Sequence, residues 1–225
     1  MLSIESIGLS EFIAIDLETS GLNSNKDKII EISAYRFRNG KPVNSFTKLV
    51  NPEIQINSTT TQITGITNQM LVNQPIFGDI ENEFLLFIDT LPIVGHNIMF
   101  DLSFLEANIK NYYNVFDDRM VCDTFYLSKI YAYHLSSFSL SSLCKSFNIP
   151  VFNAHRAEED AKNSGLLLIE LSKNILKTNL YSAQRIDDCI SSYNVPNKKL
   201  FKNIINRLIN INDDIELEEI DENKM

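Results

Sequence analysis

The sequence predicts an α/β fold in which a mixed sheet carries helices on its faces. Short apolar stretches rich in isoleucine alternate along the chain with longer segments of helical period, as strands and helices do. Asn39-Gly40 separates the second and third apolar stretches, and this dipeptide is a strong signal for a hairpin turn. A hairpin-connected start followed by strand–helix units indicates a sheet with both antiparallel and parallel pairs.

The predicted strands are short, and most are apolar. Residues 11–17 are apolar and rich in isoleucine, so we expect this strand to be buried. Residues 28–38 show the partial alternation of a second strand. The other predicted strands are residues 45–50, 92–95 and, as an edge strand, 120–122.

Helical period predicts most of the remaining elements. Ser139 precedes residues 140–147, where its hydroxyl can accept a hydrogen bond from the first turn of a helix. Residues 51–74 are rich in Asn, Gln and Thr, so we expect loop or short irregular turns there. The predicted helices are residues 76–90, 100–111, 124–133, 140–147, 158–176, 181–193 and 197–211.

Length and composition fit one globular domain with or without an extension. The chain has 225 residues, of which 44% are hydrophobic and 22% charged. No apolar run reaches the roughly eighteen residues of a membrane span, and the N-terminus lacks the basic and apolar regions of a signal peptide. Cys122, Cys144 and Cys189 are scattered, as idle thiols in a reducing compartment are. We therefore expect a cytoplasmic protein.

Charge is distributed unevenly along the chain. The net charge is −9, of which residues 213–225 carry −6, so this tail is expected to be disordered. The rest is near neutral, which argues against a protein that coats nucleic acid but is compatible with a site that holds cations. The last predicted helix has basic residues beside an apolar stripe. It is either packed on the domain with a solvated basic face or a partner-binding segment.

Two acids interrupt the first predicted strand. Asp16 and Glu18 are two residues apart, so on a strand their side chains point to the same face. Carboxylates in such a place repel each other and lose hydration, which a cation between them would offset. Oxygen ligands of this kind suit Mg²⁺ or Mn²⁺. The alternative is an ordinary strand end whose acids reach solvent.

Three further residues could belong to the same site. Asp101 opens a predicted helix after a strand, where α/β proteins place their sites, although acids are common in first helical turns. His155 and Asp160 flank the start of the long predicted helix, a spacing that means little alone. Together with Asp16 and Glu18 they supply the carboxylates that two Mg²⁺ ions about 4 Å apart require, and a histidine that can deprotonate a water.

Three ordered motifs make the chain resemble the DEDDh (DnaQ-like) 3′–5′ exonucleases. They are DLET at residues 16–19, HNIMFDLSFL at 96–105 and HRAEEDA at 155–161. The family includes the proofreading epsilon subunit of bacterial DNA polymerase III and the exonuclease domain of PolC-type polymerases. The resemblance covers about residues 10–176 and implies a ribonuclease H-like fold, a mixed five-stranded sheet flanked by helices. Supporting matches are IIEISAYRF at 29–37, VNP at 50–52, GIT at 65–67 and CDT at 122–124.

The resemblance also implies roles for individual residues. The general base would be His155, and His96 would be structural. Many relatives have histidine before the GIT sequence, where this chain has Thr64, which puts one substrate contact in doubt. Phe100 and Phe104 are expected in the core. The implied metal ligands are Asp16, Glu18, Asp101 and Asp160, and the implied substrate-binding residues are Thr19, Ile63, Thr64, Gly65 and Asn97.

The expected function is metal-dependent hydrolysis of single-stranded or frayed DNA 3′ ends to nucleoside 5′-monophosphates, with two Mg²⁺ or Mn²⁺ ions as cofactors. Proofreading or repair linked to a DNA polymerase subunit is the favoured role. An RNA-trimming or oligoribonuclease-type enzyme and a catalytically silent nucleic-acid-binding module are the alternatives. Residues 1–176 would be the exonuclease domain, 177–212 a helical extension and 213–225 the acidic tail.

Overall fold

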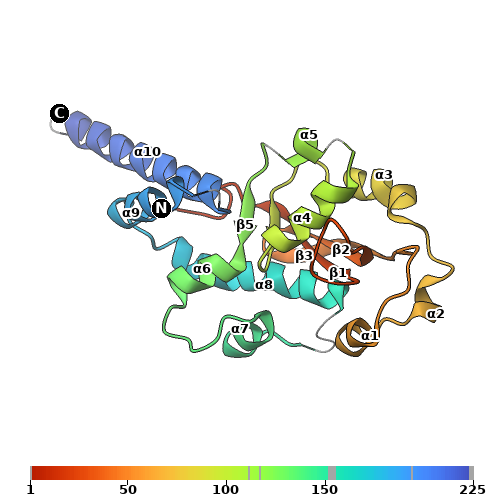
Figure 1. Ribbon diagram of the computed structural model, residues 1–225. Helices are drawn as coiled ribbons and strands as arrows, with labels where there is room; N and C mark the ends of the chain where they lie inside the picture. The colour runs from red at the N-terminus through yellow and green to blue at the C-terminus, as the bar shows by residue number, and fades with distance from the viewer. Residues whose placement is uncertain (1, 111, 117, 152–155, 194, 223–225) are drawn as a thin grey trace.

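A five-stranded sheet forms the centre of the molecule, with helices on both faces (Figure 1). The computed structural model describes residues 2–110, 112–116, 118–151, 156–193 and 195–222. The spatial strand order is β3-β2-β1-β4-β5. β1–β2 and β2–β3 are antiparallel, whereas β1–β4 and β4–β5 are parallel, so the predicted mixed sheet is confirmed. The strands are β1 (Glu11–Thr19), β2 (Ile29–Arg38), β3 (Lys41–Leu49), β4 (Ile93–Gly95) and β5 (Val121–Asp123).

Side chains of β1 alternate between two separate hydrophobic clusters. Phe12 and Ala14 belong to the cluster that contains α6 (Thr124–Tyr131), α7 (Leu140–Ser146) and α8 (Ala157–Ile175). Ile13 and Ile15 belong to the opposite cluster, with α3 (Phe77–Ile88) and α4 (Met99–Asn108). Because strand side chains alternate with period two, Asp16 follows Phe12 and Ala14 onto the α8 face.

Close packing brings α8 onto the sheet. A Cβ atom at Gly165 would lie 2.3 Å from Cε2 of Phe37 on β2, so only glycine allows this approach. The Phe37 ring is itself stacked on Phe12, with 4.9 Å between the ring centroids. This contact fixes the height of α8 above β1 and β2, and with it the position of the first turn of α8.

The helical extension is packed into the same core as the rest of the chain. It comprises α9 (Leu180–Ser191) and α10 (Lys198–Glu222), and Leu200, Phe201 and Ile204 of α10 are fully buried. The apolar stripe of the last helix therefore packs on the domain, which was one of the two expected alternatives. Figure 1 shows α10 starting beside β5 and projecting away from the sheet.

Asn197 joins the start of α10 to the edge strand. Its N–H donates to the Val121 carbonyl at 2.8 Å, and its Oδ1 accepts the N–H of Asp123 at 2.9 Å. The Asn197 backbone has φ of 73°, a left-handed conformation that asparagine tolerates better than most residues. β5 is the last strand of the sheet, so the predicted edge strand is confirmed. Asn197 forms hydrogen bonds to the free edge of this strand.

Four expectations differ from the structure. Within residues 51–74 the chain forms two short helices, α1 (Ser58–Thr64) and α2 (Asn68–Leu71), because Asn57 and Thr67 cap their first turns. A further short helix, α5 (Tyr112–Phe116), follows α4. β3 begins at Lys41, directly after the hairpin turn. The last predicted helix ends at residue 211, whereas α10 continues to Glu222, because a helix that is already packed extends by one hydrogen bond per residue.

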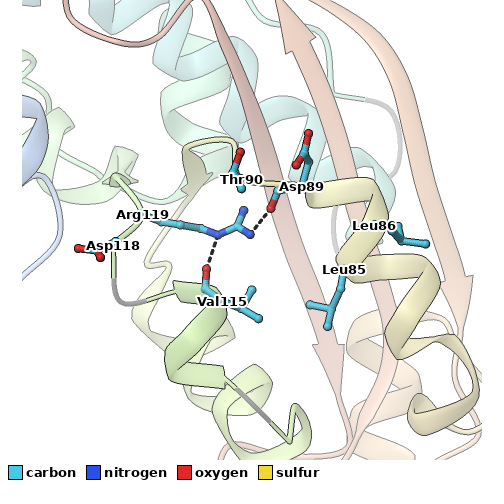
Figure 2. A pocket seen from close by; sticks show the side chains of 7 residues that line it. All are labelled: Leu85, Leu86, Asp89, Thr90, Val115, Asp118 and Arg119. Atoms are coloured by element: carbon cyan, nitrogen blue, oxygen red, sulfur yellow. Dashed lines mark hydrogen bonds between the residues drawn. The ribbon is translucent and has the colours of Figure 1, made fainter.

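Arg119 ties together the elements at the far end of β4. Its guanidinium donates to the carbonyls of Val115, Ile88 and Leu91 at 2.6, 3.3 and 3.1 Å, and also to that of Asp89. Figure 2 shows this arginine between α3 and α5, in the wall of a hollow of about 420 Å³. The hollow lies beside the amino end of β4, whereas the predicted site lies at the carboxyl end. Among the described residues, no helix is long and apolar enough to cross a membrane.

Candidate active site

Three carboxylates gather at the carboxyl end of β1. Asp16 and Glu18 come from the strand, and Asp160 comes from the first turn of α8, which packs over the same face. One oxygen from each of the three lies within 4.8 Å of the others. All three side chains are partly exposed, so the cluster is open to solvent on one side.

Asp101 approaches the cluster from the opposite face of the sheet. It lies in the first turn of α4 and is 4% exposed. Its Oδ1 accepts the backbone N–H of Leu17 at 2.9 Å, so it is fixed against β1 between the two strand acids. Its charge is also the largest electrostatic influence of a single residue on Asp16. The structure thus brings together the four carboxylates that the sequence singled out.

Burial and mutual repulsion both raise the pKa values of these acids. Burial raises the pKa of Asp16 well above its usual range, and the charges of Asp101 and Asp160 raise it further. Burial also raises the pKa of Asp101, although the hydrogen bond from Leu17 opposes the shift.

The pKa of Glu18 is also raised, even though the cationic Arg156 lies nearby. Burial, followed by the charges of Asp160 and Glu31, raises the pKa of Glu18 to about 7, and Arg156 offsets only part of this. A cluster of this kind is stable at neutral pH when a cation enters it. An all-oxygen donor set fits Mg²⁺ or Mn²⁺.

An ion pair between the buried Glu31 and the partly exposed Arg156 positions the start of α8. Glu31 of β2 is fully buried and lies opposite Glu18 in the strand register. Its carboxylate accepts hydrogen bonds from Arg156 Nε at 3.1 and 3.2 Å and from Nη2 at 2.5 Å. It also accepts the N–H of Ala157, the first residue of α8, at 2.9 Å. Glu31 therefore caps the helix that carries Asp160, a role that Arg156 itself does not fill.

Sequence reasoning assigned no role to Glu31, although a signal was available. It lies in the apolar strand sequence IIEIS. A carboxylate buried there requires a cationic or N–H partner elsewhere in the chain. The partner could not be named from the sequence, because 125 positions separate Glu31 from Arg156.

A second buried acid shapes the loop before α4. Asp123 at the end of β5 accepts the backbone N–H groups of Asn97 and Ile98 at 3.0 and 3.2 Å. Asn97 has φ of 62°, a left-handed conformation that turns the chain from β4 into α4. Asp123 therefore helps to aim Asp101, and the CDT sequence that contains it is structural support for the site.

A pocket of about 380 Å³ adjoins the acid cluster at Glu18. The predicted residues Thr19, Ile63 and Thr64 line it, and Thr60 ties its two walls together by donating to the Ser20 carbonyl at 3.0 Å. The other lining residues include Leu17, Gly21, Leu22, Asn57 and Phe100.

The predicted substrate-binding residues and the two phenylalanines differ in how they lie around this pocket. Thr64 is 5% exposed, and its hydroxyl is used inside α1, where it donates to Thr60 and accepts from Ile66. Gly65 is the left-handed residue that ends α1, and it does not line the pocket. Asn97 is exposed and lies outside the lining. Phe104 is buried as expected, and Phe100 is partly buried: it packs against the same core cluster and also lines the pocket.

Of the two histidines in the predicted motifs, the structure describes only His96. His155 lies outside the described residues. His96 is held on both ring nitrogens, by the Thr124 hydroxyl and by the Phe138 carbonyl, each at 2.9 Å. Burial lowers the pKa of His96. His96 is therefore a structural residue, as expected.

Comparisons with known proteins agree with this geometry. A family model described as RNase T exonuclease matches residues 13–168. A DNA polymerase III of PolC type from Caldanaerobacter subterraneus subsp. tengcongensis is 33% identical over 190 residues, 84% of this chain. The 3′–5′ exonuclease DinG of Staphylococcus epidermidis is 32% identical over 164 residues, 73% of this chain. The chain spans only 14% and 18% of the lengths of these two relatives.

Solved structures with a similar fold include exonucleases. Exonuclease X, in complex with 5′-overhanging duplex DNA, is 25% identical with a TM-score of 0.58, over 72% of this chain and 92% of its own. A structure of exonuclease I is 20% identical with a TM-score of 0.63, over 78% of this chain and 45% of its own.

The sheet order, the helices on both faces and the acids at the carboxyl end of β1 define a ribonuclease H-like exonuclease fold. Within that class, the chain belongs to the RNase T exonuclease family, and it is of the DEDDh (DnaQ-like) type.

Proposed function

We propose that this protein is a metal-dependent 3′–5′ exonuclease that releases nucleoside 5′-monophosphates from single-stranded or frayed DNA 3′ ends. The observation that carries the proposal is the convergence of Asp16, Glu18, Asp101 and Asp160 beside a nucleotide-sized pocket. Family membership and the raised pKa values of the acids support it.

The four carboxylates would hold two divalent cations, Mg²⁺ or Mn²⁺. Such ions activate a water for attack on a phosphodiester and stabilise the oxygen that leaves. The chain's own contribution is to keep the four acids in place. Asp101 is fixed by the Leu17 N–H, and Asp160 is fixed through the Glu31 cap of α8.

His155 is proposed as the general base that takes a proton from the attacking water. Its assignment rests on the resemblance to DEDDh enzymes and on its place in the chain. It directly precedes Arg156, which is bound to Glu31, and Glu31 lies opposite Glu18 in the sheet.

The pocket at Glu18 is proposed to hold the 3′-terminal nucleotide. Thr19 and Ile63 would contact it, with Thr64, Gly65 and Asn97 shaping the surroundings. The wall formed by Leu17, Leu22 and Phe100 offers an apolar surface to a base. A paired end must unpair before it can enter, at a cost of a few kcal/mol, so frayed or mismatched ends would be preferred without base reading.

DNA is the proposed substrate, and a polymerase is the proposed functional partner. The PolC-type relative is named as a DNA polymerase, and the exonuclease X structure contains DNA. Proofreading or repair is the role that fits both. RNA trimming uses the same chemistry and is separated by the test below.

The test compares 5′-labelled DNA and RNA oligonucleotides of one sequence, incubated with Mg²⁺ or with EDTA. Stepwise shortening of the DNA from its 3′ end, abolished by EDTA and by Asp101→Asn, is the expected result. Asp79→Asn is the matched control, because Asp79 is an exposed acid in the first turn of α3. Preference for RNA would overturn the DNA assignment, and shortening of neither strand in Mg²⁺ or Mn²⁺ would overturn the proposed activity.

A further inference from the structure

A groove of about 430 Å³ lies on the other side of α4 from the nucleotide pocket. It is bounded by α4, α5, the edge strand β5 and the segment that leads into α10. Met99 lines the groove, and the next residue, Phe100, lines the nucleotide pocket. Asp101 follows in the same helical turn. The two hollows therefore both reach the first turn of α4, which also carries Asp101 of the acid cluster.

Aromatic side chains form one wall of this groove. Tyr112, Tyr113 and Phe116 of α5 line it, and Tyr113 is 60% exposed. The rings of Tyr112 and Phe116 are stacked, with 4.7 Å between their centroids, and Tyr113 meets Tyr112 edge to face. An exposed aromatic ring beside a groove, such as that of Tyr113, is a surface on which a base of a single strand can stack.

Two lysines form the opposite wall. Lys198 and Lys199 begin α10, and the bonds of Asn197 to β5 hold them beside the groove. The Lys199 ammonium lies 3.4 Å from the fully exposed Asp118, and Lys198 donates to the Ser191 carbonyl at 3.1 Å. Surface pairs of this kind contribute little, so a phosphate can replace them.

The charged residues that line the groove are positive on balance. Lys198, Lys199 and Arg119 line it together with Glu106, whose carboxylate accepts the hydroxyl of Tyr113. Met99, Leu102 and Glu106 line the groove along one face of α4, over about 10 Å of helix. A strand whose 3′-terminal nucleotide lies in the pocket would have its scissile phosphate at the acids, and the groove begins at the same helical turn.

We infer that the groove binds the single-stranded nucleic acid upstream of the scissile phosphate, with bases stacked on the α5 tyrosines and phosphates beside Lys198 and Lys199. The inference rests on the proposed exonuclease function and assigns a substrate contact to the helical extension. α10 thus contributes to binding as well as to the core.

A single tryptophan placed in the groove would report binding directly, because the chain has none. Tyr113→Trp is titrated with a dT12 oligonucleotide that carries a 3′-terminal phosphorothioate, with Ca²⁺ in place of Mg²⁺ to limit cleavage. The expected result is saturable quenching of the tryptophan fluorescence. Tyr181→Trp is the control, since Tyr181 is 73% exposed on α9. Quenching that is absent, or equal in both variants, would overturn the inference.

Charge reversal tests the lysine wall. Lys198→Glu/Lys199→Glu is compared with Lys173→Glu/Lys177→Glu, which makes the same charge change at exposed positions near the far end of α8. Loss of two phosphate contacts lowers the salt slope of single-strand binding by about 1.4, which is about 25-fold in affinity at 0.1 M salt. Thermal unfolding of each variant establishes that it is folded.

Equal losses in the two charge variants would overturn the groove assignment. Hydrolysis of the p-nitrophenyl ester of thymidine 5′-monophosphate by the unaltered protein tests the proposed function separately, because this substrate has no upstream strand. Ester hydrolysis without dT12 binding would overturn the groove and keep the exonuclease. If dT12 binds at the groove but the ester is not hydrolysed, the proposed exonuclease activity is overturned and the groove assignment is kept.

Discussion

Replacement of Glu31 by alanine should destabilise the protein by about 3 kcal/mol. The carboxylate is fully buried, so its loss leaves Arg156 and the Ala157 N–H without their partner. Removal of the helix cap costs about 1 kcal/mol. Breaking a fully buried ion pair costs 3–5 kcal/mol, but the Arg156 side chain is 40% exposed and can turn to water, so about 2 kcal/mol is the appropriate share.

Thermal unfolding followed by circular dichroism in EDTA measures this loss. For a chain of this length, 3 kcal/mol corresponds to a fall in Tm of about 6–12 °C. Glu83→Ala is the control, because Glu83 is an exposed acid 3.5 Å from Lys48, and its loss should leave Tm within about 2 °C. Glu31→Gln keeps one acceptor oxygen but loses the charge, so its effect should fall between the two.

Cation binding by the Glu31 variants provides an independent test. Because Glu31 positions the helix that carries Asp160, Glu31→Ala should weaken cation binding as well as stability. A Tm shift no larger than that of Glu83→Ala would refute the reasoning that Glu31 holds the start of α8.

Three further predictions follow from contacts in the fold and site. Gly165→Ala should cost about 1–3 kcal/mol in urea unfolding, because its Cβ would overlap Phe37; a neutral result would contradict the close approach of α8. Folding raises the pKa of Glu18 to about 7, so the folded protein favours the protonated acid. In EDTA, the free energy of unfolding should therefore fall by about 3 kcal/mol as pH rises from about 4.5 through 7. A free energy of unfolding that rises over this range would contradict the prediction. Asn197→Gly keeps the left-handed backbone but loses the side-chain bonds to Asp123, so unfolding free energy should drop by about 1–3 kcal/mol, whereas an unchanged value would show that α10 docks without them.

Much of the fold was predictable because its elements follow local rules. The strand at residues 11–17, the Asn39-Gly40 hairpin and the Ser139 cap depend on short-range pattern and turn chemistry, and the structure confirms them. The short helices α1 and α2 were missed because they are capped turns of a few residues, too short to show a helical period. The extent of α10 was missed because composition does not report the packing of its first half.

The acids of the site were predictable from the sequence, but the residues that position them were not. The spacing of Asp16 and Glu18 fixes their common face, and the motifs brought in Asp101 and Asp160. Glu31 and the other supporting residues act through contacts between positions far apart in sequence, which one sequence does not reveal. The hydrogen bonds of the Thr64 hydroxyl to Thr60 and Ile66 were likewise not predicted.

The central claim is that the acids at the carboxyl end of β1 form a divalent cation site. Calorimetric titration with Mn²⁺ at pH 7.5, without nucleic acid, tests it most directly. The account predicts saturable binding by the unaltered protein and by Asp79→Asn, and its loss in Asp16→Asn and Asp160→Asn. Equal Mn²⁺ binding by all four proteins would contradict the claim.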